Sequence, residues 1–311
     1  MLNRSKYATY AWATVVMNVV VILWGAVVRA TGSGAGCGNS WPDCGGTFIP
    51  VEPQTATAIE FVHRVTSGTA LLMVLGLLVI AFRRYPEGSG ARKGAAWSTV
   101  FILVEALVGA GLVLFDLVED NESLARAVVM ALHLANTMLL LGSLTLTAWW
   151  MAGGPRLRWR GRGSIALALG ASLVGVVLLG MTGAVTALAD TLYKAETIAQ
   201  GLALDVDAGS PLLVRIRWIH PALAVIVAVV VLLTATYVRR ERPLPLVDRF
   251  ASTAYWLAIA QVVLGAVNLA LATPVWMQVV HLAFADALWI ALVLLSAATL
   301  ADVDEGDTGV S

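Results

Sequence analysis

Eight long apolar runs are the feature of this sequence that most limits how the chain can fold. Each has roughly 20 residues or more, the length that an α-helix needs to cross the hydrocarbon core of a bilayer. Only 13% of the 311 residues are charged, whereas soluble domains average about 25%. The sequence therefore predicts an all-α integral membrane protein with eight transmembrane helices. The runs lie near residues 10–29, 58–82, 96–116, 125–151, 164–188, 212–238, 249–272 and 275–300.

The basic residues predict the orientation of these spans. In an eight-span arrangement, 14 of the 20 Lys and Arg residues fall on the side that holds both chain ends. By the positive-inside rule, both termini are then cytoplasmic and the chain crosses the plasma membrane. Residues 302–311 are acidic and predict a disordered tail. The 14 basic residues are Arg4, Lys6, Arg83, Arg84, Arg92, Lys93, Arg156, Arg158, Arg160, Arg162, Arg239, Arg240, Arg242 and Arg249.

A repeated pattern of glycine and histidine predicts two similar halves. A glycine followed by alanine lies towards the outer end of each odd-numbered span, and the chain's four histidines each lie near the outer start of an even-numbered span. The separations from glycine to histidine are 38, 24, 37 and 16 residues, alternately long and short. The glycines are Gly25, Gly109, Gly183 and Gly265, and the histidines are His63, His133, His220 and His281.

The spacing between the halves supports a parallel duplication. The first and third glycines are 158 residues apart, and the first and third histidines are 157 apart. We therefore predict two pseudo-symmetric four-helix bundles. Residues 1–152 would form the N-terminal half and residues 164–301 the C-terminal half, joined by a cytoplasmic linker at residues 153–163.

The four histidines predict two haem sites. Each lies about six to eight residues inside its predicted span, which is roughly 9–12 Å below the outer end. Ionisable residues inside a membrane usually face the bundle interior and mark a functional site. Two histidines on facing helices of a four-helix bundle are suitable axial ligands for haem iron. A structural zinc site is a poorer match, because it needs four converging Cys or His ligands. The predicted pairs are His63 with His133, and His220 with His281.

A carboxylate accompanies the first histidine. Glu60 precedes His63 by three residues, so the two side chains share one helix face. Glu60 would therefore point towards whatever His63 binds. An intrahelical ion pair with Arg64, or snorkelling to the interface, is the alternative interpretation. Arg64, Arg215 and Arg217 near the outer surface are candidates for holding haem propionates.

The other histidines have no carboxylate at that spacing. Arg217 precedes His220 by three residues, and Asp286 follows His281 by five, on a different helix face. This asymmetry predicts that the N-terminal half carries out the chemistry and that the C-terminal half holds a resident haem.

The two cysteines, Cys37 and Cys44, both lie in the first outer loop. Outside the plasma membrane the setting is oxidising, so a disulfide is expected. The pair is either a structural staple or a redox-active pair, and the sequence leaves both open.

Together these residues resemble the haem A synthase family over essentially the whole chain. The resemblance rests on "RATGSG" (29–34), the cysteine pair, "EFVHR" (60–64) and the single histidines at positions 133, 220 and 281. It implies a membrane oxidoreductase that oxidises a peripheral methyl group of haem O to a formyl group. The product would be haem A for terminal oxidases.

The resemblance also implies roles for individual residues of the N-terminal half. His63 and His133 match the pair that lines the substrate haem site, which binds haem O and releases haem A. Glu60 matches a carboxylate that is required for activity, and we expect it to accept a proton or to hold a water molecule near the reacting edge.

In the C-terminal half, His220 and His281 match the axial ligands of a b-type haem. Cys37 and Cys44 match the loop disulfide of the cysteine-containing members. The loop between them departs from the family's usual residues, although the cysteine spacing is kept. Pro221 stands where the first half has Arg64, which changes how the second haem is seated.

Two other functions compete with this interpretation. A dihaem electron carrier similar to a membrane cytochrome b explains the four histidines equally well, but not the single Glu60 or the cysteine pair. A small-molecule transporter leaves the histidine pattern as coincidence. The expected partners are membrane lipid, an unknown electron acceptor and a haem O synthase, with no nucleic acid. Whether the chain forms a homo-oligomer is left open.

Overall fold

The structure is a computed structural model that describes residues 6–158 and 161–302. Within these residues the regular structure is helical, with isolated β-bridges and no β-sheet. Part of the predicted linker and nearly all of the predicted acidic tail lie outside the described residues. The helices are α1 (Lys6–Ala30), η1 (Ser33–Ala35), α2 (Thr55–Arg84), α3 (Gly90–Leu114), α4 (Leu124–Met151), α5 (Gly163–Leu192), α6 (Ile198–Val206), α7 (Leu212–Ile216), α8 (Ile219–Glu241), α9 (Pro245–Ala270) and α10 (Val275–Leu300).

Eight spans are long and apolar enough to cross a membrane, with α7 and α8 together forming the sixth. Their outward faces carry large apolar side chains, among them Leu72, Leu107 and Leu233, which are 66–69% exposed. Such a surface is unfavourable in water and suits a lipid environment. The chain is therefore a multi-pass membrane protein, and the prediction of an all-α fold is confirmed.

The sixth span differs from the prediction of one continuous helix. Pro221 has no backbone N–H, so it cannot donate to the carbonyl of Arg217 four residues earlier. The Arg217 carbonyl instead accepts from His220 N at 3.3 Å and from Thr186 Oγ1 at 3.3 Å. His220 consequently lies in the first turn of α8.

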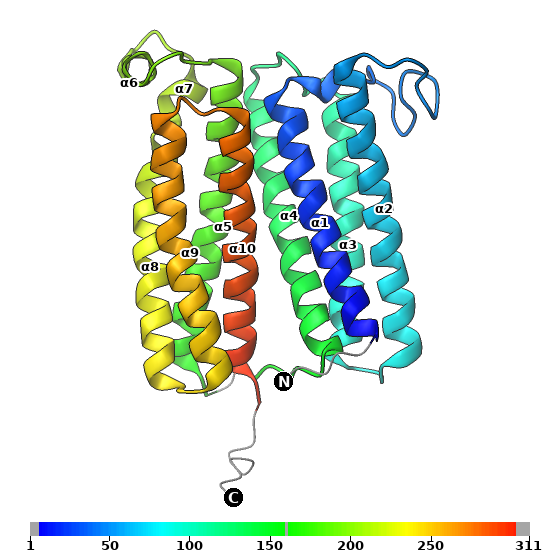
Figure 1. Cartoon of the computed structure of the whole chain (residues 1–311), viewed down its shortest axis with the longest axis vertical. Helices are drawn as coiled ribbons and strands as arrows, with labels where there is room; N and C mark the ends of the chain where they lie inside the picture. Colours follow the sequence, from blue (N-terminus) through cyan, green and yellow to red (C-terminus); the bar gives the residue numbers. More distant parts are fainter. Residues whose placement is uncertain (1–5, 159–160, 303–311) are drawn as a thin grey trace, which may run out of the picture.

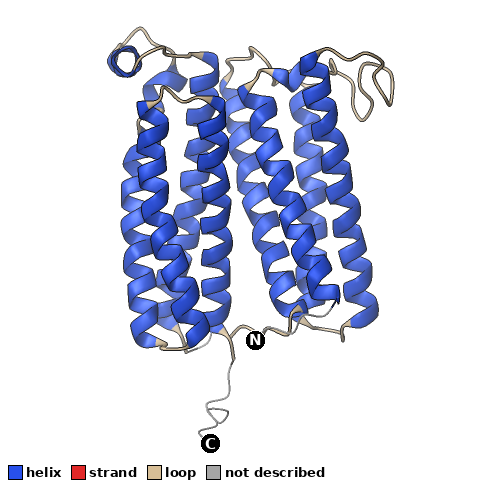
Figure 2. Ribbon diagram, viewed as in Figure 1, coloured by secondary structure: helices blue, strands red, loops and turns tan. Residues whose placement is uncertain are grey.

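The long helices form two groups of four (Figures 1 and 2). In one group α1 packs against α2 and α4, and α3 packs against the same two helices. In the other, α5 and α9 each pack against α8 and α10. Two groups of four helices agree with the predicted architecture. The pseudo-symmetry that relates them stays a prediction.

Between the two groups, α4 packs most extensively against α5 and also against α10. Trp289 of α10 donates its indole N–H to the carbonyl of Met138 on α4 at 2.8 Å. The same ring lies over Gly142, where a methyl group would come within 3.4 Å of it. A close helix approach at a glycine, with one hydrogen bond across it, is a typical way to join helices in a membrane.

The two ends of the helix bundle differ in character (Figure 1). The terminal face, where α1 begins and α10 ends, carries the α2–α3, α4–α5 and α8–α9 connections. The opposite loop face carries the segment 31–54 and the short helices α6 and α7. At the terminal face the linker runs beside the end of α10, because Arg158 N donates to Leu300 O and Asp302 N donates to Arg156 O.

Candidate haem-binding sites

Each histidine ring lies against the glycine of the preceding span. A methyl group added to Gly25 would lie 3.1 Å from Cε1 of His63, and one added to Gly183 would lie 3.0 Å from Cε1 of His220. The corresponding distances are 3.4 Å from Gly265 to His281 and 3.9 Å from Gly109 to His133. The glycine and histidine pattern of the sequence therefore has a physical reason. Because glycine has no side chain, the imidazole ring of the following span can lie directly against the glycine backbone.

Each helix group carries two of the histidines, on helices that do not neighbour each other. Helices α2 and α4 stand diagonally opposite each other, because each packs against both α1 and α3, and α8 and α10 stand in the same relation. His63 and His133 lie on α2 and α4, and His220 and His281 lie on α8 and α10. The two histidines of each predicted pair are therefore on opposite helices of the same group, and their role as a ligand pair stays a prediction.

The ring nitrogens fit axial ligation of haem. Nδ1 of His63, His133 and His281 is buried and has no hydrogen-bond partner. His220 Nδ1 lies 3.2 Å from Leu179 O and 3.3 Å from Thr182 Oγ1. In residues 6–158 and 161–302 no hydrogen bond engages Nε2 of any of the four rings. Neutral imidazole nitrogens are common metal ligands, so these ring nitrogens are compatible with the predicted ligation of haem iron, which stays a prediction.

The same part of the chain does not favour a zinc site. Among the described residues, no group of three or more His, Cys, Asp or Glu side chains is arranged to hold a metal ion. Structural zinc needs about four such ligands, whereas haem iron in a six-coordinate site needs only two from the protein.

Glu60 and Arg64 form an ion pair that holds the first loop of the loop face. The two side chains are 2.5 Å apart, and only 4% of the Glu60 side chain is exposed. Glu60 Oε2 also accepts from Cys37 N at 2.8 Å. Arg64 donates to Ser40 O at 2.7 Å and to Asp43 O. The structure therefore contains the intrahelical ion pair that was the alternative interpretation, and this pair also links α2 to the cysteine loop.

The cysteine loop is closed by a disulfide between Cys37 and Cys44, as predicted. Both cysteines are buried. A backbone hydrogen bond from Gly45 N to Cys37 O and a β-bridge between Cys44 and Thr47 hold the loop further. Whether the pair is structural or redox-active stays open.

Sequence reasoning missed a second carboxylate in the N-terminal half. Oε1 of Glu105, on α3, lies 3.4 Å from Nδ1 of His133, within ion-pair range but outside hydrogen-bond geometry. The available signal was an acidic residue in the middle of the apolar run 96–116, since such residues are rare in a membrane and usually functional.

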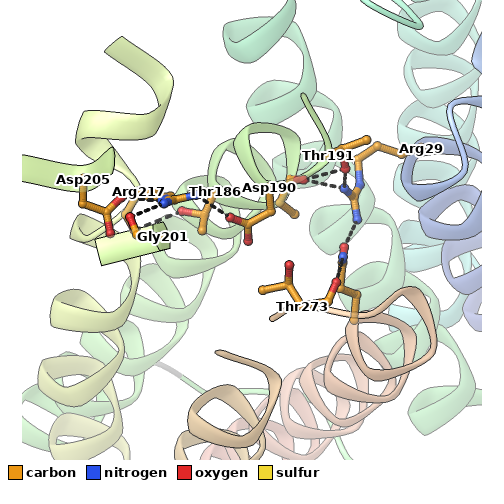
Figure 3. Close-up of polar contacts among 10 residues, drawn as sticks. Arg29, Thr186, Asp190, Thr191, Gly201, Asp205, Arg217 and Thr273 are labelled. Atoms are coloured by element: carbon orange, nitrogen blue, oxygen red, sulfur yellow. Dashed lines mark hydrogen bonds and ion pairs between the residues drawn. The ribbon is translucent and has the colours of Figure 1, made fainter. Parts of the chain in front are cut away.

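A second polar cluster lies at the loop face of the C-terminal half (Figure 3). Arg217 donates to Asp190 at 3.2 Å, to Asp205 and to Gly201 O at 2.7 Å. These contacts join α5 to α6 and to the residue that follows α7. Arg215, the other candidate for propionate binding, is exposed. Propionate binding by either residue stays a prediction.

Arg29 connects the two halves in the same region (Figure 3). From the end of α1 it donates to Ala187 O at 2.6 Å and Thr191 Oγ1 at 2.6 Å, both on α5, and to Gln278 Oε1 at 2.7 Å on α10. The sequence placed Arg29 at the outer end of the first predicted span, 10–29. The structure shows that it is the last-turn residue of a helix and fixes three helix ends together.

Asp286 of α10 is buried, and its Oδ2 has no hydrogen-bond partner within the described chain. The C-terminal half therefore also has a buried carboxyl group within one of its spans. Among the described residues, this group makes no hydrogen bond or ion pair with His281 or His220.

The glycine contacts make a direct prediction. Gly25→Ala should weaken haem binding by the N-terminal half, because the new methyl group would push against His63 at 3.1 Å. The measurement is haem content per purified chain, with the absorbance spectrum reporting the axial ligands. Gly109→Ala is the matched control, because a methyl group there lies at an ordinary 3.9 Å from His133. Equal haem content in the two variants would contradict a tight fit at Gly25.

Known proteins are similar to this chain. Over 296 residues the chain is 48% identical to a Thermus thermophilus protein named protoheme IX farnesyltransferase, covering 95% of this chain and 49% of that protein. Over 138 residues it is 35% identical to haem A synthase of Bacillus mycoides and 34% identical to that of Bacillus cereus, covering 43% of this chain and 42% of each relative. The chain spans about half the length, or less, of these relatives.

Residues 8–293 match COX15-CtaA, the family of cytochrome oxidase assembly proteins. This match includes the four histidines, Glu60 and the cysteine loop. The chain therefore belongs to the COX15-CtaA family, the haem A synthase family of cytochrome oxidase assembly proteins.

Proposed function

We propose that this protein is a haem A synthase that oxidises one peripheral methyl group of haem O to a formyl group. The observation that carries the proposal is the two histidines on opposite helices of each half, whose Nε2 atoms make no hydrogen bond within the described residues, in a chain of this family. The N-terminal half differs from the other by the carboxylate three residues before its histidine, Glu60, which is buried in an ion pair with Arg64.

The reaction is a four-electron oxidation. A formyl group has one oxygen more and two hydrogens fewer than a methyl group. With water as the oxygen source, R–CH3 + H2O gives R–CHO + 4 H⁺ + 4 e⁻. The site must therefore admit a source of oxygen, release protons and pass electrons to an external acceptor.

In the N-terminal half, His63 and His133 would hold the iron of the substrate haem and so fix which edge of the macrocycle faces the protein. Glu60 would accept a proton near that edge, directly or through a water molecule. Its hydrogen bonds from Arg64 and from Cys37 N hold the carboxylate in one orientation. The cysteine loop would exclude bulk water from this end of the site.

In the C-terminal half, His220 and His281 would hold a b-type haem, which supplies one-electron transfer between the substrate site and the acceptor. The contacts of Arg217 and Arg29 keep the helix ends around this site in place. The domain boundaries follow from this division, with residues 1–152 as the substrate half and residues 164–301 as the electron-transfer half.

We further propose that the terminal face is cytoplasmic and that the loop face lies outside the plasma membrane. Two independent features agree on this orientation. Arg83, Arg84, Arg239 and Arg240 lie at the helix ends of the terminal face, and the disulfide lies on the loop face, as expected for an oxidising compartment. A reporter that fluoresces only in the cytoplasm should be active when fused to the C-terminus, and a dark fusion would contradict the orientation.

The Thermus relative suggests a partner. That protein is about twice as long as the segment that matches this chain, and it is named for farnesyl transfer to protohaem IX. Farnesylated haem is the chemical class of haem O. We therefore propose that a haem O synthase supplies the substrate, tested by its co-purification with this chain from detergent-solubilised membranes.

The deciding experiment is co-expression with a source of haem O, followed by chromatography and mass analysis of the extracted haems. A formyl-bearing haem, absent when the source is expressed alone, supports the synthase. Haem b as the only bound haem, with haem O left unchanged, would favour the dihaem electron carrier. A purified chain without haem would contradict both.

A further inference from the structure

Glu105 is an acidic residue that faces a predicted iron ligand from another helix. It lies on α3 with Oε1 3.4 Å from Nδ1 of His133. Two residues of α4 hold its carboxylate in place. Asn136 donates to Oε2 at 2.5 Å, and the hydroxyl of Thr137 donates to Oε1. Asn136 and Thr137 are both buried, so the carboxylate is fixed beside the ring.

The C-terminal half provides an internal comparison for this carboxylate. Glu105 precedes Gly109 by four residues, and the residue four before Gly265 is Gln261. Gln261 also contacts its histidine helix, but its amide donates to the backbone carbonyl of His281 at 2.9 Å. At matching positions on corresponding helices, one half has a carboxylate at the imidazole and the other has a neutral amide at the backbone.

The residues that support the carboxylate show the same difference. Asn136 and Thr137 follow His133 by three and four residues. The residues that follow His281 by three and four are Phe284 and Ala285, which cannot donate a side-chain hydrogen bond. The whole arrangement of carboxylate and two donors is thus confined to the N-terminal half.

A carboxylate at the second nitrogen of a metal-bound imidazole fixes the orientation of the ring and raises its basicity as a ligand. A more basic ligand stabilises ferric over ferrous iron, because the more highly charged ferric ion is stabilised more by electron donation from the ligand. Hydrogen bonding and charge in this outer shell are among the main means by which a protein sets a haem potential.

We propose that Glu105 is a positioning residue for His133 that lowers the reduction potential of the haem in the N-terminal half below that of the haem in the C-terminal half. The proposal rests on the proposed function, because it takes His133 to be an iron ligand. A lower reduction potential of the substrate haem favours electron transfer from that haem to the resident haem. This is the direction that a four-electron oxidation of the substrate requires.

The test is a redox titration of the purified, haem-loaded chain in detergent, followed by absorbance. The unmodified chain should show two one-electron waves. Glu105→Gln keeps the shape of the side chain and removes its charge, so the lower wave should move to higher potential while the upper wave stays. A tenfold loss in the preference for ferric haem corresponds to about 59 mV for one electron.

Gln261→Ala is the matched control at the same position of the other half, and it should leave the lower wave in place. Thr137→Val keeps the carboxylate but removes the hydroxyl that holds Oε1, and it should move the lower wave less than Glu105→Gln does. This variant also tests the proposal if Glu105→Gln fails to fold.

The failures of the two proposals are distinguishable. If the unmodified chain binds no haem, the proposed function itself is wrong. If it shows two waves and Glu105→Gln lowers thermal stability without moving either, the role of Glu105 is only structural and this inference is wrong. An equal shift of both waves would likewise overturn it.

Discussion

Replacing His63 by alanine is expected to abolish the conversion of haem O and to leave the chain with haem in its C-terminal half. Loss of a residue that only supports a metal ligand typically costs 10–100-fold in affinity or activity. Loss of the ligand itself should cost at least about 100-fold. The measurements are haem content per chain, the absorbance spectrum and chromatography of the product after co-expression with a haem O source.

His220→Ala is the matched control, because both histidines lie against a glycine of the preceding span. It should remove the haem of the C-terminal half, while substrate haem still binds to the N-terminal half. Conversion should stall in this variant because the electrons cannot leave. Wild-type conversion by His63→Ala would contradict the assignment of the substrate site to the N-terminal half.

Glu60→Gln is the second substitution with a large expected effect. It keeps an oxygen that can accept from Cys37 N but removes the charge that pairs with Arg64. A positioned general base typically contributes 10²–10⁴-fold to a rate, so conversion should fall by about that factor. The measurement is the rate of formyl-haem formation at matched haem O content.

The same substitution should loosen the cysteine loop. Breaking a buried ion pair leaves one charge uncompensated and typically costs about 3–5 kcal/mol, although Arg64 retains its bonds to Ser40 O and Asp43 O. Thermal unfolding and the rate of proteolysis within residues 38–54 measure this effect. A slower reaction with an unchanged loop would assign Glu60 to the chemistry, and a loose loop with full activity would assign it to structure alone.

Asp248→Asn provides the control for removing an ion pair as such. Asp248 pairs with Arg239 at the terminal face, where the two side chains are 59% and 46% exposed. Surface pairs contribute about 0–1 kcal/mol, so this variant should keep both its stability and its rate of conversion. A large loss of either would show that the assay responds to any lost ion pair.

The position of Glu60 shows how far sequence reasoning reached at the candidate site. Its three-residue spacing to His63 and four-residue spacing to Arg64 are local properties of one helix, so the ion pair was among the predicted interpretations. The contact with Cys37 N was not predicted, because it depends on how the segment 31–54 folds back over α2. The helical periodicity of the sequence does not predict the path of a loop of this length.

The position of Glu105 shows where sequence reasoning failed. Its residue type was visible inside an apolar run, but its partner His133 lies 28 residues later on another helix. Which side chains meet between two helices depends on how each helix is rotated about its axis. That rotation is set by packing against neighbours on all sides, as at the close approach of Gly94 to Thr147.

The sequence by itself determined the membrane spans, the basic face, the cysteine pair and the four histidines with their glycines. These features are set by hydropathy, charge and residue type along the chain, which act locally and do not need the fold. The tertiary structure decided that the histidine helices stand diagonally, that Arg29 of α1 reaches Ala187 of α5, and that Glu105 lies beside His133. Such contacts join residues far apart in the chain, and only the packing of all the helices together brings them within reach.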